Sequence, residues 1–228
     1  MGIIRERAAL RNRVGVFRDR AEAGKELAKE LRGVVGEESI ILAIPAGGVP
    51  VAAAAADELG LAFDVIIVRK IQLPYESEAG FGAVGPEDEV ILDEDLVRGL
   101  NLSDREIEAQ VSVTKKSRAG RERAFRGDAS FPDLRRKQVI LVDDGLATGS
   151  TMLAAARFVR KKGASSTVVA VPTASMRAIE VLRQEVDEIL CPNVRSGPYF
   201  AVADAYIDWH DVAEEEAISF LRSHRRMA

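Results

Sequence analysis

An unbroken apolar run that leads into two adjacent carboxylates and a loop of small residues constrains this chain more than any other feature. Residues 139–142, Val-Ile-Leu-Val, have the pattern of a strand buried on both faces. Asp143 and Asp144 would then emerge at the carboxyl end of that strand. Residues 145–151 contain two glycines, two threonines and a serine, and they precede a helix expected over residues 152–162. The sequence therefore predicts an α/β fold with polar groups at the carboxyl edge of its sheet.

The loop after the two acids is suited to holding a phosphate. Its members are Gly145, Leu146, Ala147, Thr148, Gly149, Ser150 and Thr151. Backbone amides of such a turn bind anions together with the unpaired amides and positive dipole of a helix N-terminus. A carboxylate beside a bare phosphate would repel it, so Asp143 and Asp144 must face hydroxyl groups or a divalent cation. A ribose 5-phosphate meets both requirements. The alternative is a tight turn whose acids only cap the helix.

At these residues the chain resembles a known family. The apolar run, the Asp-Asp pair and the pattern Gly-x-x-Thr-Gly-x-Thr resemble the phosphoribosyl-pyrophosphate (PRPP) signature of the type I phosphoribosyltransferases. The resemblance covers residues 19–211 and implies a Rossmann-like, five-stranded parallel core with a flexible loop and a C-terminal hood. It also implies that Asp143 and Asp144 are the catalytic residues. Mg²⁺ would enter with PRPP; no direct ligation by the protein is predicted, and Asp143 and Asp144 are the alternative ligands.

A second turn containing glycines follows the strand expected over residues 39–44. Ala46, Gly47 and Gly48 would open at the same sheet edge, where ligands of such sheets bind. The two glycines allow backbone amides to approach a pyrophosphate closely. The resemblance places the pyrophosphate loop here, often with a cis peptide, and suggests Arg69 and Lys70 as added cations. Ala46 departs from the basic residue that the family commonly has before Gly-Gly. A plain turn and a solvated strand end are the alternatives.

Strand-like and helix-like segments alternate along the chain, which is typical of a mostly parallel sheet covered by helices. Core strands are expected over residues 39–44, 64–69, 139–142, 167–171 and 186–190. One helix is expected to begin at Asp19, and others to cover residues 50–59, 152–162 and 175–183. We predict a transferase core over residues 1–190, and a C-terminal hood with a terminal helix over residues 191–228.

Three segments fall outside this alternation. Residues 72–86 and 90–92 suggest a flexible loop or hairpin within about residues 70–92. Ser103 and Glu106 form a capping box that starts a helix reaching toward residue 126. We interpret the basic run of that helix as a solvated face, with steering of a polyanion as the alternative. Its members are Lys115, Lys116, Arg118, Arg121, Arg123 and Arg126. In the aromatic tail, which we define as residues 191–211, Tyr199 and Phe200 are candidates for stacking an acceptor base.

The composition argues against several classes of protein. The formal net charge of −4 and the pI near 5.5 give no basic footprint, which argues against nucleic acid as a partner. A single cysteine, Cys191, and two histidines make disulfides and a zinc centre unexpected. No apolar stretch reaches the ~18 residues of a membrane span. Residues 1–20 carry charges where a signal peptide would be apolar. We therefore expect a cytoplasmic protein without a membrane partner.

The two loops and the family resemblance together predict a Mg²⁺-dependent enzyme. It would transfer a 5-phosphoribosyl group from PRPP to a nitrogen nucleophile, such as a nucleobase in nucleotide salvage, and release pyrophosphate. The alternative is a regulatory protein of the same fold that binds PRPP without transfer, and Ala46 keeps that alternative open. No side chain stands out as a general base, and the tail does not identify the acceptor. The resemblance also suggests a homodimer.

Overall fold

The central sheet of the protein is parallel and carries its helices on both faces. The structure is a computed structural model that describes residues 1–127 and 129–225, with side chains described outside residues 76–79 and 225. Six parallel strands lie in this part of the chain. Their order is β1 (Ile3–Arg5), β10 (Glu188–Leu190), β8 (Ser166–Ala170), β7 (Gln138–Val142), β2 (Ser39–Ala43) and β3 (Phe63–Val65). The α/β class is confirmed, and each of the five expected core strands is present, but the strand expected over residues 64–69 ends at Val65. The edge strand β1 was not predicted because three residues are too few to display a period.

Strands β2 and β7 are neighbours whose pairing fixes the relation between the two predicted loops. Their register runs from Ser39 opposite Gln138 to Ala43 opposite Val142. One residue further on, the amide of Ile44 still donates to the carbonyl oxygen of Val142 at 2.8 Å. Because the strands are parallel and end at the same level, the turn after β2 and the acids after β7 leave the sheet side by side.

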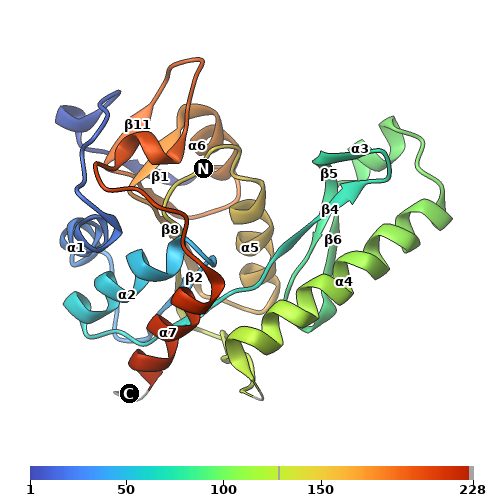
Figure 1. Cartoon of the computed structure of the whole chain (residues 1–228), viewed down its shortest axis with the longest axis horizontal. Helices are drawn as coiled ribbons and strands as arrows, with labels where there is room; N and C mark the ends of the chain where they lie inside the picture. Colours follow the sequence, from blue (N-terminus) through green and yellow to red (C-terminus); the bar gives the residue numbers. More distant parts are fainter. Residues whose placement is uncertain (128, 226–228) are drawn as a thin grey trace.

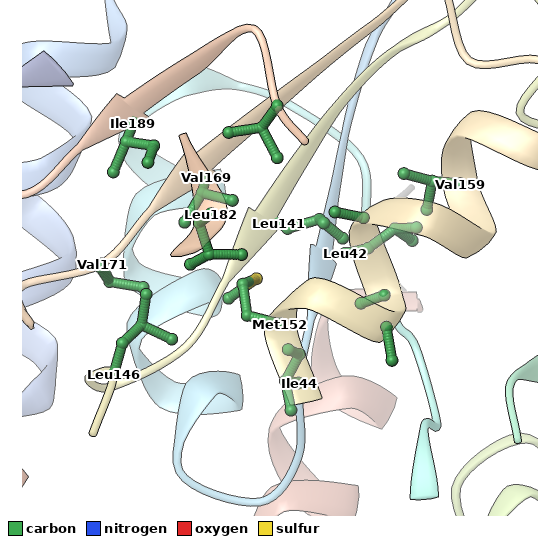
Figure 2. Packing of buried hydrophobic residues seen from close by; sticks show 14 of the residues in the cluster. Leu42, Ile44, Leu141, Leu146, Met152, Val159, Val169, Val171, Leu182 and Ile189 are labelled. Atoms are coloured by element: carbon green, nitrogen blue, oxygen red, sulfur yellow. The ribbon is translucent and has the colours of Figure 1, made fainter. Parts of the chain in front are cut away.

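Alternation along the strands divides the apolar core into two layers. Leu42 and Leu141 point toward α5 (Ser150–Lys161) and α6 (Met176–Leu182), as Figure 2 shows. Ile41 and Ile140 belong to the opposite layer, with α1 (Arg20–Leu31), α2 (Gly48–Leu59) and α7 (Glu214–Arg225). Burial of each such side chain contributes about 1.5–3 kcal/mol. Both faces of the sheet are therefore covered, and its carboxyl edge is left for the loops.

A hairpin and two helices project from this core as an arm (Figure 1). The arm contains β4 (Arg69–Leu73), β5 (Glu76–Val84), β6 (Val90–Leu92), α3 (Glu94–Gly99) and α4 (Asp104–Arg126). The predicted hairpin is present as an antiparallel sheet in the order β4-β5-β6, and α4 begins at the predicted capping box. Residues 80–85 spell Gly-x-Gly-x-x-Gly, but they run along the antiparallel strand β5 and end at a three-residue 3₁₀ helix, not at the start of an α-helix. They are therefore no dinucleotide-binding turn.

The prediction of a solvated basic face on α4 is wrong at Arg118 and Arg126. These side chains belong to residues that are 4% and 5% exposed. Arg126 donates to Asp64 Oδ2 at 2.7 Å, and Arg118 donates to Asp88 Oδ1 at 2.9 Å. Arg123 is exposed, as predicted. The buried arginines attach α4 to the edge strand β3 and to the turn before β6, so they fix the base of the arm.

The tail is more ordered than its composition suggests. It contains β11 (Asn193–Arg195), which pairs with β9 (Thr173–Ser175), and a short 3₁₀ helix (Val202–Ala205). Phe17, just before α1, forms a bridge with Tyr206, and its amide donates to the carbonyl oxygen of Ala205 at 3.0 Å. The tail therefore lies along the start of α1. None of the helices in the described residues is long and apolar enough to cross a membrane.

Candidate functional site

Two loops predicted to share a site lie in direct contact. A Cβ atom on Gly47 would stand 2.0 Å from Asp144 Oδ2, and one on Gly48 would stand 2.8 Å from the Cα of Asp143. Neither gap can hold a methyl group, so glycine is required at both positions by the closeness of the acidic pair. The structure thus brings the Gly-Gly turn and the two carboxylates together at the carboxyl edge of the sheet.

Ala46 stands directly before the two glycines of the turn, whereas the two predicted basic residues belong to β4. Ala46 packs against the apolar layer that contains α2, and its peptide bond with Pro45 is cis, as the resemblance implies. Arg69 begins β4 and does not end a core strand, because β3 stops at Val65. Lys70 follows it in β4. The Nε atom of Arg69 is buried and finds no hydrogen-bond acceptor within the described part of the chain.

Arg121 of α4 is a second cation beside Arg69. Burial lowers the pKa of Arg121, and the charge of Arg69 lowers it further. The carboxylate of Glu214 is the counter-charge, with Oε2 lying 3.1 Å from Nε of Arg121. Among the described side chains, Arg69 and Arg121 are neighbouring guanidinium groups with the carboxylate of Glu214 beside Arg121, an arrangement that a bound anion would stabilise.

The two acids occupy different electrostatic environments. Arg20, in the first turn of α1, donates through Nε and Nη2 to Asp144 Oδ2 at 2.9 and 2.8 Å. Asp143 Oδ1 accepts from the amide of Asp144 at 2.9 Å. Burial raises the pKa of Asp143 well above its ordinary value, and the charge of Asp144 adds to this. Arg20 offsets part of the negative charge of Asp144, which reduces the repulsion between the acidic pair and a phosphorylated ligand.

Residues 206–210 hold Arg20 from its other side. The guanidinium carbon lies 4.0 Å from the centroid of the Trp209 ring and 5.7 Å from that of Tyr206. Nη1 donates to the carbonyl oxygen of His210 at 2.8 Å. The Tyr206 hydroxyl donates to the backbone oxygen of Asp144 at 2.6 Å. Burial, followed by the charge of Asp144, raises the pKa of Tyr206 well above its ordinary value, so the phenol keeps this proton.

Arg20 and its aromatic partners were not among the predicted site residues. Arg20, Leu27 and Leu31 are all buried on one side of α1. Their spacing of seven and four residues is that of a helical stripe. A charged residue on the apolar stripe of a helix is the sequence signal that could have indicated a buried ionic partner.

The predicted phosphate loop ends in a left-handed residue. Gly149 has φ of 77° and is the N-cap of α5, where the first amides of a helix have no acceptor within the helix. Ala147, Thr148 and Ser150 are exposed, and the two hydroxyl oxygens of the latter pair lie 3.1 Å apart. The Ser175 hydroxyl donates to the carbonyl oxygen of Ala147 at 2.6 Å, so the inner side of the loop is fixed. The outer side offers amides and hydroxyls to an anion. Thr151 follows in the first turn of α5.

The two residues that begin this loop serve its structure. Leu146 is 3% exposed, its amide donates to the carbonyl oxygen of Thr173, and its own carbonyl accepts from the amide of Ser175. Its backbone amide thus already has an acceptor within the fold, and a phosphate-binding role of Leu146 stays a prediction. Gly145 is buried, and a Cβ atom there would lie 2.6 Å from a methyl group of Val202.

The two candidate base-stacking residues have different surroundings. Tyr199 is 89% exposed, whereas Phe200 is partly buried with the guanidinium carbon of Arg195 lying 5.6 Å from its ring centroid. Val202, close behind them, contacts Gly145. The segment thus approaches the phosphate loop, and the stacking role of either ring stays a prediction.

The acidic pair fits a protein-held Mg²⁺ poorly. Arg20 occupies Asp144 Oδ2, and a guanidinium so close would repel a second cation. Within residues 1–127 and 129–225, no group of three or more His, Cys, Asp and Glu side chains is placed to hold a metal ion. The carboxylate of Asp143 and the Oδ1 atom of Asp144 are the oxygens that remain to bind a cation or to accept hydrogen bonds from ribose hydroxyls.

Comparison with known proteins relates this site to one family. Residues 17–203 match the family model described as "Phosphoribosyl transferase domain". A Mycobacterium tuberculosis protein named "Putative phosphoribosyl transferase" is 35% identical over 217 residues, which cover 93% of this chain and 48% of the relative. The chain thus spans about half the length of this relative.

Two further comparisons differ in extent. The crystal structure of a Thermus thermophilus protein has a TM-score of 0.78 and 36% sequence identity, covering 91% of this chain and 98% of the other. An adenine phosphoribosyltransferase of Mycobacterium avium is 51% identical over 39 residues, which are 17% of this chain and 22% of that protein.

Proposed function

The chain belongs to the phosphoribosyl transferase domain family, and from this premise we propose that it transfers a 5-phosphoribosyl group from PRPP to a nitrogen nucleophile and releases pyrophosphate. The observation that carries this proposal is the contact of the Gly-Gly turn with the acidic pair. Residues 145–149 connect this pair to the N-terminus of α5, where the first amides have no acceptor within the helix. A single ligand with a phosphate, adjacent hydroxyls and a pyrophosphate has the same order of groups.

Each part of the site has a role in the proposed reaction. The exposed amides and hydroxyls of residues 147–151 bind the 5′-phosphate. Asp143 and the Oδ1 atom of Asp144 accept hydrogen bonds from the ribose hydroxyls. The turn at residues 46–48, with Arg69 and Lys70, binds the pyrophosphate. Mg²⁺ bound with the pyrophosphate would neutralise part of its charge.

The acids also suit the charge that develops during transfer. As the bond from ribose C1 to the pyrophosphate breaks, the ring gains positive character. Carboxylates fixed near the ring stabilise that charge without reorganising. Arg69 stabilises the opposite charge that gathers on the leaving group. The proposed site therefore separates groups of the two signs along the direction of bond breaking.

A nucleobase is the acceptor that we propose. The short match to an adenine phosphoribosyltransferase supports this acceptor class, as does the aromatic character of the segment that contains Tyr199 and Phe200. A base would need a flat apolar surface, which a ring can provide.

A PRPP-binding protein without transfer is the second candidate. It is favoured by Ala46, since the turn before the glycines offers no cation to the leaving group. Such a protein would bind PRPP and pyrophosphate but would not consume PRPP in the presence of a base.

Titration calorimetry followed by an activity assay tests both candidates. PRPP and ribose 5-phosphate should each bind to the purified protein, and PRPP with Mg²⁺ and a panel of purine and pyrimidine bases should release pyrophosphate. Binding without release from any base would favour the regulatory candidate. Absence of binding by PRPP and ribose 5-phosphate would contradict both candidates.

A further inference from the structure

We propose that Arg20 is a positioning residue for the ribose-binding carboxylate of Asp144, and that residues 206–210 act on the site through Arg20. This inference rests on the function proposed above. It assigns a role in ligand recognition to a helix start and a tail segment that neither the family signature nor the two loops include.

Arg20 decides which oxygen of Asp144 a ligand can reach. Two nitrogens of one guanidinium donate to the same oxygen, Oδ2, from a planar fork. Gly47 leaves no room on that side, because even a Cβ atom would lie 2.0 Å from Oδ2. The carboxylate is thereby held in one orientation, with Oδ1 as the oxygen available to a ribose hydroxyl.

Arg20 is itself held by the tail. The guanidinium carbon lies 4.0 Å from the centroid of the Trp209 ring, and the third nitrogen, Nη1, donates to the carbonyl oxygen of His210 at 2.8 Å. The Tyr206 hydroxyl returns to the backbone of Asp144 at 2.6 Å. The contacts therefore form a closed circuit from Asp144 through Arg20 and the tail, and back to Asp144. A substitution of any residue in this circuit should change the orientation of the Asp144 carboxylate.

A positive charge alone is not enough at position 20, because the arrangement depends on the planar guanidinium group of arginine. A lysine at position 20 would keep the charge, but its single ammonium group cannot donate through two nitrogens of a plane while stacking on an indole ring. Arg20→Lys is therefore the informative variant, since it preserves charge balance with Asp144 and removes the orientation. Arg18→Lys is the matched control, because Arg18 is exposed and pairs with Asp19 instead.

The test is the affinity of each folded variant for ribose 5-phosphate, PRPP and pyrophosphate, measured by calorimetry. Arg20→Lys should weaken binding of the two ribose ligands by roughly tenfold or more, the effect of a misplaced charge-assisted hydrogen bond. Pyrophosphate, which has no hydroxyls, should bind within about twofold of the parent, as expected for a ligand without that bond. Arg18→Lys should bind all three ligands as the parent does. General damage to the fold would not select the ribose ligands.

Trp209→Leu tests the tail without touching either charged group. It should weaken binding of the ribose ligands in the same selective way, by less than Arg20→Lys, and Trp209→Phe should recover most of the loss because a ring face remains. In a double-mutant cycle, Arg20→Lys should have little further effect on ribose binding once Asp144→Asn is present. This non-additivity would identify Asp144 as the group through which Arg20 acts.

The outcomes separate this inference from the proposed function. If the parent binds ribose 5-phosphate and both Arg20→Lys and Trp209→Leu bind it equally well, Arg20 has no positioning role while the proposed function stands. If Arg20→Lys does not fold, Trp209→Leu decides alone. If the parent binds neither ribose 5-phosphate nor PRPP, the proposed function and this inference are both wrong.

Discussion

The turn at residues 44–48 and the turn at residues 145–149 leave neighbouring parallel strands at the same edge, yet they use glycine for different reasons. In the first, Gly47 is needed for space, because any side chain would overlap Asp144. In the second, Gly149 is needed for its backbone angle, with φ of 77°. The first turn packs against the protein's own acids, and the second exposes hydroxyls to solvent. Two turns at equivalent places in the fold therefore have different roles: the first shapes the site, and the second exposes groups that a ligand can reach.

The largest expected effect is that of Gly47→Ala, which tests the claim that the first turn needs space. The added methyl group must displace either the turn or the carboxylate of Asp144, at a cost of about 1–3 kcal/mol in unfolding free energy. PRPP binding should fall with it. Gly120→Ala is the control, because Gly120 lies in α4 with nothing near its missing Cβ atom. That change should stabilise the protein by about 0.5–1 kcal/mol. Equal stability of Gly47→Ala and the parent in thermal unfolding would contradict the packing described.

Gly149→Ala tests the claim that the second turn needs a left-handed residue. The substitution should cost about 1–2 kcal/mol of stability because an alanine is strained at positive φ. It should also weaken binding of ribose 5-phosphate, since the amides that follow would move. Gly149→Asn should recover much of the stability, because asparagine tolerates this conformation better. Chemical denaturation of the three proteins measures the difference. If alanine and asparagine behave alike, the backbone angle is not the reason for glycine here.

Ala46→Arg would give the first turn the cation that it lacks. PRPP and pyrophosphate should bind more tightly by roughly 1 kcal/mol, while ribose 5-phosphate should be unaffected because it has no pyrophosphate. Ala46→Gln adds a similar length without charge and should have little effect. Equal tightening of all three ligands would show that the added charge acts as a general attraction. It would then give no support to a pyrophosphate site in this turn.

The smallest expected effect is that of Thr148→Val, which removes one hydroxyl from the second turn. The Thr148 side chain is exposed, so its hydrogen bond to a phosphate should contribute on the order of 0.5 kcal/mol. Ribose 5-phosphate and PRPP should lose this affinity equally, with no change in pyrophosphate binding. An unchanged affinity for ribose 5-phosphate would remove the Thr148 hydroxyl from the proposed phosphate donors and leave the backbone amides with the hydroxyls of Ser150 and Thr151.

The acidic turn could be predicted because its information is local. A five-residue strand, two acids, a glycine-containing turn and the start of α5 follow one another without interruption between Gln138 and Ser150. Each step has a residue preference of its own, so the sequence pattern and the backbone agree. The hairpin was equally accessible, since glycine and proline mark its turns.

Contacts between distant segments could not be predicted in this way. Arg20 lies on the apolar stripe of α1, which indicates a buried ionic partner, but Asp144 is 124 residues away and nothing in the sequence identifies it as that partner. Arg118 and Arg126 each have one acidic partner on α4 itself, Glu122, which suits a solvated helix face. Their other partners, Asp88 and Asp64, lie 30 and 62 residues away, and the sequence pattern of the helix does not reveal these contacts with other elements.

The separation of Arg20 from its partners also affects the order in which the site is made. His210 lies 190 residues after Arg20. Domains begin to fold while the ribosome is still adding residues. A nascent chain halted before residue 206 already contains all six strands of the central sheet and both turns. Its Arg20 lacks the ring of Trp209 and the carbonyl oxygen of His210, to which Nη1 donates in the complete fold. Such a chain should have a nearly complete core in which the carboxylate of Asp144 is not yet oriented, so the proposed recognition of ribose would be completed only late in synthesis.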